Sequence, residues 1–539
     1  MQTLLGADLI VETLAREGIS YVFTLPGGQM NPVHFAVDEK PGMELILPRQ
    51  EGAGALMAAG YAMASGKPAC IMTTVGAGIA YEIGALYLAW KERLPLISIS
   101  PQVQSHKMKP IQENLQACDQ DEIFKPITKF NAICYHRDRI PNLIRRALKM
   151  ALAPEYGPVH LDVPVDVIYG FKMVSDKKMK NLFPGTASRF SGNIMPDPAG
   201  VETAASLIAN AERPLVLAGR NVERARAGEH LDSFLRMTGF PAIPSAAAFG
   251  AVKDSDLNLG ACELWHHPEN RQMLAQTDLV LLLEADETTA RMAQALKLIN
   301  PEIPVIQTAE LAASVGALVP LTAGLVGSPG AVFDALCRSL QVASQSLAVT
   351  DRWKAALLQT FSNIIQGMPD NPDIATAGKD TFYGILHTIN RINNLITSND
   401  KIVCEGRAAA MAAMAYLKRP GLHNCHILVD DDIPGAGYPV SLGVKLAAPD
   451  ARVFLISETD LFKRHHRELQ TQKRYRLNTT SLLFKSRETR PDHEVDFVTL
   501  AKSLGVSAQS LTDPEEEITD TLLCEGEQCL TGMLFDATA

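Results

Sequence analysis

The stretch Met43–Ser100, MELILPRQEGAGALMAAGYAMASGKPACIMTTVGAGIAYEIGALYLAWKERLPLISIS, decides the fold of this chain. Its apolar runs MELILP, PACIMTT and PLISIS are short and are closed by Pro or Gly, which is typical of buried strands. Runs rich in Ala and Gly, with the composition of buried helices, separate these strands. Strands that alternate with helices predict a parallel α/β sheet.

The same alternation continues on both sides of this stretch. ISYVFTLPGG precedes it, GPVHLDVPVDV follows it, and similar runs recur as far as TTSLLFKS. At roughly 100 to 200 residues per domain, 539 residues suggest about three domains. A polar segment at 172–198 and a less regular one at 343–379 separate the blocks. We therefore predict an α/β protein with three parallel-sheet domains, at residues 1–175, 195–345 and 375–539.

Composition excludes several classes of function. The net charge of -10 argues against nucleic acid as a partner, because phosphate backbones attract the opposite sign. No apolar run reaches the roughly 18 residues of a membrane span, and the first residues do not resemble a signal peptide, so we expect a cytoplasmic protein. The nine cysteines include no C-x-x-C pair and are interpreted as buried apolar residues.

Two glycine-rich turns are the first candidate binding features. Leu25-Pro-Gly-Gly28 and Val75-Gly-Ala-Gly78 each follow a predicted strand and precede a predicted helix. Backbone N–H groups at such a junction favour anions and allow a flat ligand to approach closely. The alternative is ordinary turn chemistry, since glycine permits tight turns anywhere.

Glu51 is a sharper candidate, because it follows the strand MELILP and opens a helix of small residues. One interpretation is a favourable negative charge at a helix N-terminus. The other is a partly buried acid that hydrogen-bonds a ring nitrogen of a cofactor and tunes its protonation.

The run from Pro48 to Val103 resembles the pyrimidine-binding domain of thiamine diphosphate enzymes, in particular the large subunit of acetolactate synthase. RPLVLAGRNV, TDLVLLLEAD, GAGYPVSLGVKLAAPDARVFLIS and DFVTLAKSLGV extend this resemblance through a central and a diphosphate-binding-like domain. It implies that Glu51 activates the aminopyrimidine of the cofactor. The cofactor-binding candidates that it implies in the first domain are Pro26, Gly27, Gly28, Gly76, Gly78 and Gln116.

The third domain departs from the family's metal site. Where the family has Gly-Asp-Gly, whose Asp binds magnesium, this chain has Ser457-Glu458-Thr459. Glu458 keeps a carboxylate that is one methylene longer, and octahedral Mg²⁺ tolerates such a displacement poorly. Lys485 replaces the Asn that supplies the second side-chain ligand, and an ammonium cannot ligate a cation. We therefore predict no metal ligands, and the departures argue against both Mg²⁺ and thiamine diphosphate.

Further departures lie nearby. Arg407 and Ala408 replace a Gln-His pair that contacts the diphosphate, and Ile433 is the candidate for the apolar residue that bends the cofactor. The covering segment after Lys485 looks deleted. In the central domain, Glu284-Ala285-Asp286 replaces the flavin-binding Gly-Ala-Arg, so FAD is not expected.

A basic run, KRHHR at Lys463–Arg467, follows the altered metal loop and is predicted to be helical. It is interpreted either as a solvated helix face or as cationic side chains that replace magnesium and bind a phosphate or carboxylate. Arg407 and Lys485 are the best candidates for the second interpretation.

The resemblance implies a transferase or lyase that decarboxylates a small 2-oxo acid and joins the product to a second carbonyl. A homodimer or tetramer is expected, because family sites form between two chains. A hetero-oligomer with a paralogue is an alternative, in which this chain donates Glu51 to a partner's intact metal loop. Two other hypotheses stay open: a different, thiamine-independent reaction on a small anionic metabolite, and a non-catalytic regulatory subunit.

Overall fold

The computed structural model describes residues 2–175, 181–183, 193–253, 255–342, 351–368, 379–418, 421–428, 433–484, 495–511 and 531–535. The chain divides into two compact units. Unit 1 comprises residues 1–191 with two later segments, 438–449 and 465–477. Unit 2 comprises residues 192–437, 450–464 and 478–539.

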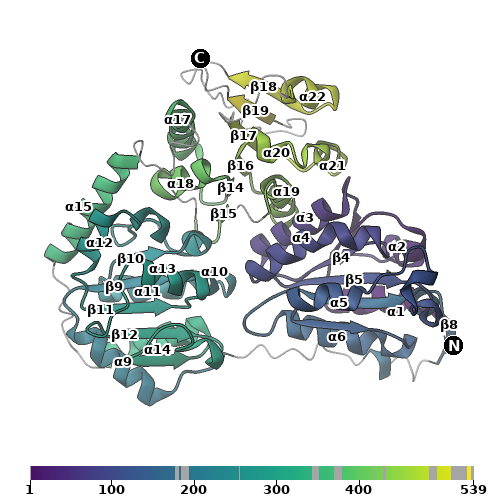
Figure 1. The fold of residues 1–539 in the computed structure, drawn as a ribbon, viewed down its shortest axis with the longest axis horizontal. Helices are drawn as coiled ribbons and strands as arrows, with labels where there is room; N and C mark the ends of the chain where they lie inside the picture. The colour runs from purple at the N-terminus through teal and green to yellow at the C-terminus, as the bar shows by residue number, and fades with distance from the viewer. Residues whose placement is uncertain are drawn as a thin grey trace. The chain divides into compact units, whose positions relative to one another are not determined.

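Unit 1 is built on a six-stranded parallel sheet with the order β3-β2-β4-β5-β7-β6 (Figure 1). The strands are β2 (Tyr21–Thr24), β3 (Glu44–Ile46), β4 (Ala69–Met72), β5 (Leu96–Gln102), β6 (Phe130–Ile133) and β7 (Val159–Pro164). A separate antiparallel pair joins β1 (Gln2–Leu5) to β8 (Phe171–Val174). The helices are α1 (Gly6–Arg16), α2 (Asn31–Asp38), α3 (Glu51–Ser65), α4 (Ala77–Lys91), α5 (Gln120–Phe124), α6 (Ile140–Ala151) and α7 (Val165–Ile168).

The stretch Met43–Ser100 forms β3, α3, β4, α4 and most of β5, in the predicted alternation of strands and helices. Every residue of α3 from Gly52 to Ala64 is buried, so this helix is apolar on all sides, as a core helix must be. It ends at Gly66 in the left-handed conformation, where glycine costs least. The later helices α19 (Gly437–Ala447) and α21 (Leu469–Arg474) place most of their residues in the same unit. Helix α19 packs so closely on α3 that a Cβ on Gly443 would lie 1.9 Å from the Met57 carbonyl oxygen.

Unit 2 contains two parallel sheets. The central sheet has the order β10-β9-β11-β12-β13. Its strands are β9 (Pro214–Ala218), β10 (Ala242–Pro244), β11 (Leu279–Leu283), β12 (Val305–Ala309) and β13 (Ala323–Val326). Its helices are α9 (Pro198–Asn210), α10 (Arg220–Arg224), α11 (Gly228–Thr238), α12 (Pro268–Leu274), α13 (Glu287–Ala295) and α14 (Pro329–Val342).

The third sheet has the order β15-β14-β16-β17-β19-β18. Its strands are β14 (Lys401–Glu405), β15 (Cys425–Leu428), β16 (Val453–Glu458), β17 (Thr479–Phe484), β18 (Ser507–Leu511) and β19 (Thr531–Phe535). The accompanying helices are α15 (Asp351–Gly367), α17 (Lys379–Leu395), α18 (Arg407–Tyr416), α20 (Thr459–Phe462) and α22 (Phe497–Ser503). Renumbered along the chain, this order is the same as that of the first sheet. The prediction of several parallel sheets is therefore confirmed.

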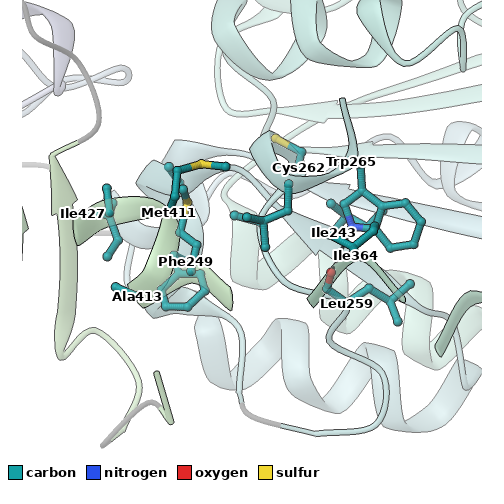
Figure 2. Packing of buried hydrophobic residues seen from close by; sticks show 14 of the residues in the cluster. Ile243, Phe249, Leu259, Cys262, Trp265, Ile364, Met411, Ala413 and Ile427 are labelled. Carbon is teal, nitrogen blue, oxygen red and sulfur yellow. Dashed lines mark hydrogen bonds between the residues drawn. The ribbon is translucent and has the colours of Figure 1, made fainter. Parts of the chain in front are cut away.

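The two sheets of unit 2 share a hydrophobic core. One cluster includes Phe249 and Trp265 beside the central sheet and Met411 and Ile427 beside the third (Figure 2). Each of these side chains is buried. The domain boundaries near residues 345 and 375 stay a prediction. Within the described residues, no helix is both long and apolar enough to cross a membrane.

Candidate active site

The first sheet has a topological switch point between β2 and β4. The chain leaves β2 for β3 on one side, and β4 lies on the other side. In open α/β sheets, ligands bind where two neighbouring connections diverge, at the carboxyl ends of the strands. The turns after β2 and β4 are the two glycine turns that the sequence indicated, so the fold brings both candidates to one place.

The two turns are in contact, and a loop closes over them. A Cβ on Gly27 would lie 1.8 Å from Cγ2 of Thr74, so the turns meet at a point where only glycine fits. The Gln29 amide donates to Oε1 of Gln116 at 2.8 Å. The Gln116 carbonyl oxygen lies 2.9 Å from where a Gly76 Cβ would stand. The structure therefore groups Gly27, Gly76 and Gln116, while Pro26 and Gly28 are exposed and Gly78 is buried.

Glu51 is the first residue of α3, directly after the short strand β3. Its side chain is half-buried and has no hydrogen bond among the described residues. The next residue, Gly52, touches α4, since a Cβ there would lie 2.6 Å from the Tyr81 carbonyl oxygen. The acid therefore stands at a helix N-terminus beside the glycine-turn helix, with its carboxylate free to contact a ligand.

The turn that carries Glu51 is clamped by the segment 465–477. Both carboxylate oxygens of Glu468 accept the Arg49 N–H, at 2.9 and 3.1 Å. The Tyr475 hydroxyl accepts the Leu47 N–H at 2.8 Å and donates to the Leu45 carbonyl at 2.9 Å. Burial raises the pKa of Glu468 to about 7, against the hydrogen bonds that it accepts. The segment 465–477 therefore holds the backbone of residues 45–49, which leads into Glu51.

The prediction that the basic run forms one helix is wrong. The chain forms the short α20, a 3-10 turn at His466–Glu468 and then the short α21. Arg464 and Arg467 are exposed, and the Arg474 guanidinium donates to the Leu47 carbonyl at 3.2 Å. Because the helix is broken, buried Glu468 and half-buried Tyr475 hydrogen-bond the backbone of residues 45–49, which precede Glu51. A continuous basic helix would not predict these contacts.

The third sheet has the equivalent switch point between β14 and β16. Glu405 ends β14, and its side chain is buried. Oε1 accepts the Gly435 N–H at 2.7 Å, and Oε2 accepts the Ser457 hydroxyl at 3.1 Å. The N–H groups of Gly435, Ala436 and Gly437 and the Ser457 hydroxyl oppose the rise in the pKa of this carboxyl group that burial causes. The Glu405 carboxyl group therefore accepts hydrogen bonds from both the loop before α19 and the end of β16.

The sequence-predicted residues of the third domain surround Glu405 unequally. Glu458 ends β16 and approaches Gly406, where a Cβ would lie 2.8 Å from its Oε1. Arg407 is exposed at the start of α18. Ile433 is half-buried, and its carbonyl accepts the Ala436 N–H at 3.2 Å. Lys485 lies outside the described residues, so its predicted role is untested.

The central sheet has its own switch point between β9 and β11, and it is closed by an ion pair. The Arg220 guanidinium lies 2.8 Å from the Asp286 carboxylate, and both side chains are buried. Although burial opposes it, Arg220 and the Thr289 donors hold the pKa of Asp286 below its usual range. Gly219 lies against the next turn, since its Cβ would stand 2.3 Å from the Glu284 carbonyl oxygen.

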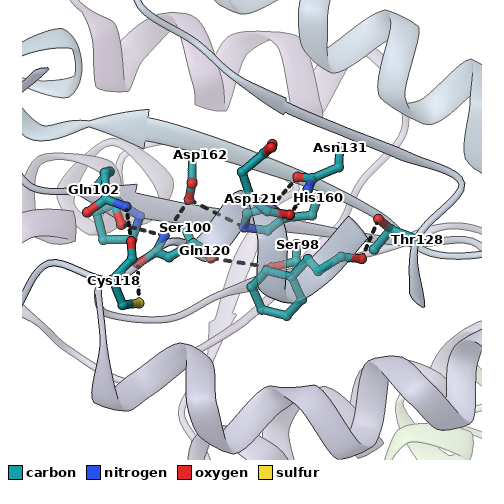
Figure 3. Close-up of polar contacts among 12 residues, drawn as sticks. Ser98, Ser100, Gln102, Cys118, Gln120, Asp121, Thr128, Asn131, His160 and Asp162 are labelled. Atoms are coloured by element: carbon teal, nitrogen blue, oxygen red, sulfur yellow. Dashed lines mark hydrogen bonds and ion pairs between the residues drawn. The ribbon is translucent and has the colours of Figure 1, made fainter. Parts of the chain in front are cut away.

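A buried polar cluster lies within the first domain, next to the Gly76 turn (Figure 3). Gln120 accepts the Gly76 N–H at 3.3 Å and donates to Asp162. Glu82 accepts the Ser98 hydroxyl at 2.9 Å. Burial raises the pKa of both Glu82 and Asp162 to about 8 and lowers that of His160 to about 3. These groups are therefore neutral near pH 7 and support the turn without charge.

No group of His, Cys, Asp or Glu among the described residues is arranged to hold a metal ion. Of the described cysteines, Cys70, Cys134, Cys262, Cys404 and Cys425 are buried, which agrees with their interpretation as core residues.

Comparison with known proteins bears on these sites. Residues 5–123 match the N-terminal TPP binding domain of thiamine pyrophosphate enzymes, and residues 201–336 match their central domain. In these two stretches, the chain is therefore similar to thiamine pyrophosphate enzymes. The probable acetolactate synthase large subunit of Methanocaldococcus jannaschii is 26% identical over 95% of this chain and 88% of its own length. The acetolactate synthase large subunit of Haemophilus influenzae is 25% identical over 96% and 91%.

The family's cofactor fits the two switch points differently. In the first domain, Glu51 offers a carboxylate that has no hydrogen bond among the described residues, and two glycine turns contact each other. In the third domain, the turn at Ser457–Thr459 that the resemblance assigns to the metal of the diphosphate lies beside Glu405, which accepts the Gly435 N–H and the Ser457 hydroxyl. The residues present there do not fit a diphosphate. In the central domain, the Arg220–Asp286 pair fills the corresponding place.

Three acids at or beside these sites were missed by sequence reasoning. Glu405 carries one signal, an acid at the last position of an apolar strand, but its partners at 435–437 lie thirty residues on. Glu468 directly follows the basic run Lys463–Arg467, and its partner Arg49 is 419 residues away. Glu82 looks like an exposed helical residue until Ser98 is placed beside it.

Proposed function

We propose that this chain is an acetolactate-synthase-like enzyme that acts on a small 2-oxo acid in decarboxylation and carboligation. The observation that carries the proposal is Glu51, a half-buried acid at the N-terminus of α3 with no hydrogen bond among the described residues. Relatives named acetolactate synthase large subunit, similar over 95 to 96% of this chain, support it. They favour it over a different reaction or a non-catalytic role.

We assign Glu51 the role of a general acid–base group toward the pyrimidine end of the cofactor. Glu51 stands at the N-terminus of α3, and its carboxylate has no hydrogen bond among the described residues to break. The Gly27 and Gly76 turns allow a flat ring to approach the backbone. Thiamine diphosphate, when bound, supplies the carbanion chemistry, and this chain's part is to position the ring and move a proton at Glu51.

We further propose that the diphosphate end is held by the third domain of a partner chain. Glu405 supports this assignment, because it accepts the Gly435 N–H and the Ser457 hydroxyl, which a diphosphate would otherwise bind in the third domain of this chain. The assembly is then a hetero-oligomer with a paralogue whose metal loop is intact, in preference to a homodimer or tetramer of this chain alone. Use of FAD is not proposed, since the central switch point carries its own ion pair. A cytoplasmic location remains our expectation.

The test is to purify this chain alone and together with a family member that keeps the Gly-Asp-Gly loop, and to measure the consumption of pyruvate with thiamine diphosphate and Mg²⁺. To isolate this chain's contribution, the partner carries Gln in place of its own pyrimidine-side Glu. We expect turnover only in the mixed assembly, and its loss when this chain carries Glu51→Gln. Turnover by this chain alone would refute the partner assignment, and no dependence on Glu51 would refute its role.

A further inference from the structure

Glu405 lies at the end of β14, and both oxygens of its carboxyl group accept hydrogen bonds from other parts of the third domain. Its side chain is 5% exposed. It receives hydrogen bonds from the Gly435 amide at 2.7 Å and the Ser457 hydroxyl at 3.1 Å, and its Oε2 lies against Gly437. These donors come from the loop before α19 and from the end of β16, so two connections converge on one carboxyl group.

This donor set is of the kind that binds oxyanions. Successive N–H groups at the start of a helix carry partial positive charge, and a hydroxyl at a strand end adds a further donor. α19 contains eleven residues, long enough to have a developed N-terminal dipole. Phosphate and carboxylate oxygens use such donors in the same way, so a carboxylate from the chain itself can take the place of a bound anion.

The geometry leaves no room for a second anion at these donors. A Cβ on Gly437 would lie 2.6 Å from Oε2 of Glu405, so the carboxyl group rests against the first residue of α19. Glu458 stands across Gly406 from it, with Oε1 2.8 Å from where a Cβ on that glycine would lie. An arriving phosphate would meet occupied donors and a second carboxylate of the same sign.

We propose that Glu405 is a built-in anion that occupies the phosphate-binding position of the third domain and keeps it closed to phosphate-bearing ligands. Burial raises the pKa of this carboxyl group, although the hydrogen bonds from Gly437, Ser457, Gly435 and Ala436 oppose that shift. Both of its oxygens accept, Oε1 from the Gly435 N–H and Oε2 from the Ser457 hydroxyl, which is the pattern of a carboxylate. The proposal deepens the proposed function, since it explains why a second chain is needed, but it concerns binding and does not require any turnover.

The experiment measures hydrogen exchange of residues 433–440 in the full chain, with and without inorganic pyrophosphate and Mg²⁺. In the wild type, we expect the amides of Gly435 to Gly437 to be protected and unaffected by pyrophosphate. In Glu405→Ala, we expect them to exchange at least tenfold faster and to recover protection when pyrophosphate is added. Wild-type protection that increases with pyrophosphate, or a Glu405→Ala variant that never gains any, would overturn the proposal.

Glu405→Gln guards against a variant that does not fold. The amide keeps the shape and one acceptor oxygen but is a weaker acceptor than a carboxylate, so we expect several-fold faster exchange of the same amides. Unchanged exchange in this variant would show that the carboxyl group is not their acceptor. Glu284→Gln is the matched control: a buried acid at a strand end of the central sheet, bonded to Thr308 at 2.9 Å, whose loss leaves 433–440 unaffected.

Failure of this proposal and failure of the proposed function give different results. Loss of Glu51-dependent turnover in the mixed assembly leaves the exchange at 433–440 as expected here. Pyrophosphate binding by the wild-type third domain leaves the dependence on Glu51 intact.

Discussion

The first and third sheets have the same strand order, yet their switch points differ in one respect. Beside the first, Glu51 starts α3 and makes no hydrogen bond among the described residues. At the third, Glu405 is buried, and hydrogen-bond donors from two connections converge on it. Topology therefore predicts where a ligand site forms, whereas a single side chain decides whether that site is open.

The largest expected effect concerns the open site. Glu51→Gln keeps the shape of the side chain but removes the acid–base function, which typically contributes 10²- to 10⁴-fold to a rate. We expect kcat of the mixed assembly to fall by about that factor, while the thermal unfolding midpoint stays unchanged. Pyruvate consumption measures this effect. Glu44→Gln, an exposed acid on the preceding strand, is the control; an equal loss in that variant would contradict the assignment.

The second prediction contrasts the two acids in stability. Glu405→Ala leaves buried N–H groups without partners, at about 1–3 kcal/mol for each unsatisfied group, so we expect a loss of about 2–4 kcal/mol. Glu51→Ala removes no internal hydrogen bond and should change stability by less than about 0.5 kcal/mol. Urea unfolding of both variants measures the difference. Equal losses of stability in the two variants would mean that Glu405 is held by internal hydrogen bonds no more than Glu51 is.

The third prediction concerns Glu82, which lies below the open site. Its folded pKa of about 8 stands above the ordinary value of 4.5, so its stabilising contribution is complete below pH 4.5 and is lost as pH rises to 8. The unfolded chain releases this proton first, which lowers the free energy of unfolding over that window by on the order of 1 kcal/mol per pH unit. Glu82→Gln should flatten this part of the stability profile. An unchanged slope between pH 5 and 8 would show that Glu82 is charged in the folded protein.

The sequence predicted the parts of the molecule that depend on local pattern. Short apolar runs closed by Pro or Gly became strands, and Glu51 and the glycine turns lie in the connections that follow β3, β2 and β4. The wrong prediction, that the basic run Lys463–Arg467 is helical, came from composition alone. It missed that Glu468 and Tyr475 must face a turn more than 400 residues earlier in the chain.

The hydrogen bonds to Glu405 in the third domain could not be predicted from the local sequence, because they too join residues far apart in the chain. Ser457-Glu458-Thr459 in place of Gly-Asp-Gly indicated the loss of a metal ligand, but nothing in that stretch names what replaces the anion. The replacement comes from β14, and it is recognised only when Gly435 and Ser457 are seen to donate to the same carboxyl group.

The smallest expected effect tests whether the clamp holds the open site in place. Tyr475→Phe removes a hydroxyl that joins the Leu47 N–H and the Leu45 carbonyl, at a cost of about 1 kcal/mol in stability because the site is half-buried. If the clamp positions Glu51, kcat falls several-fold while KM changes little, since the acid is displaced and not removed. Tyr87→Phe, on α4 outside the clamp, is the control. A stability loss without a change in kcat would show that Tyr475 holds the fold together but leaves Glu51 where it is.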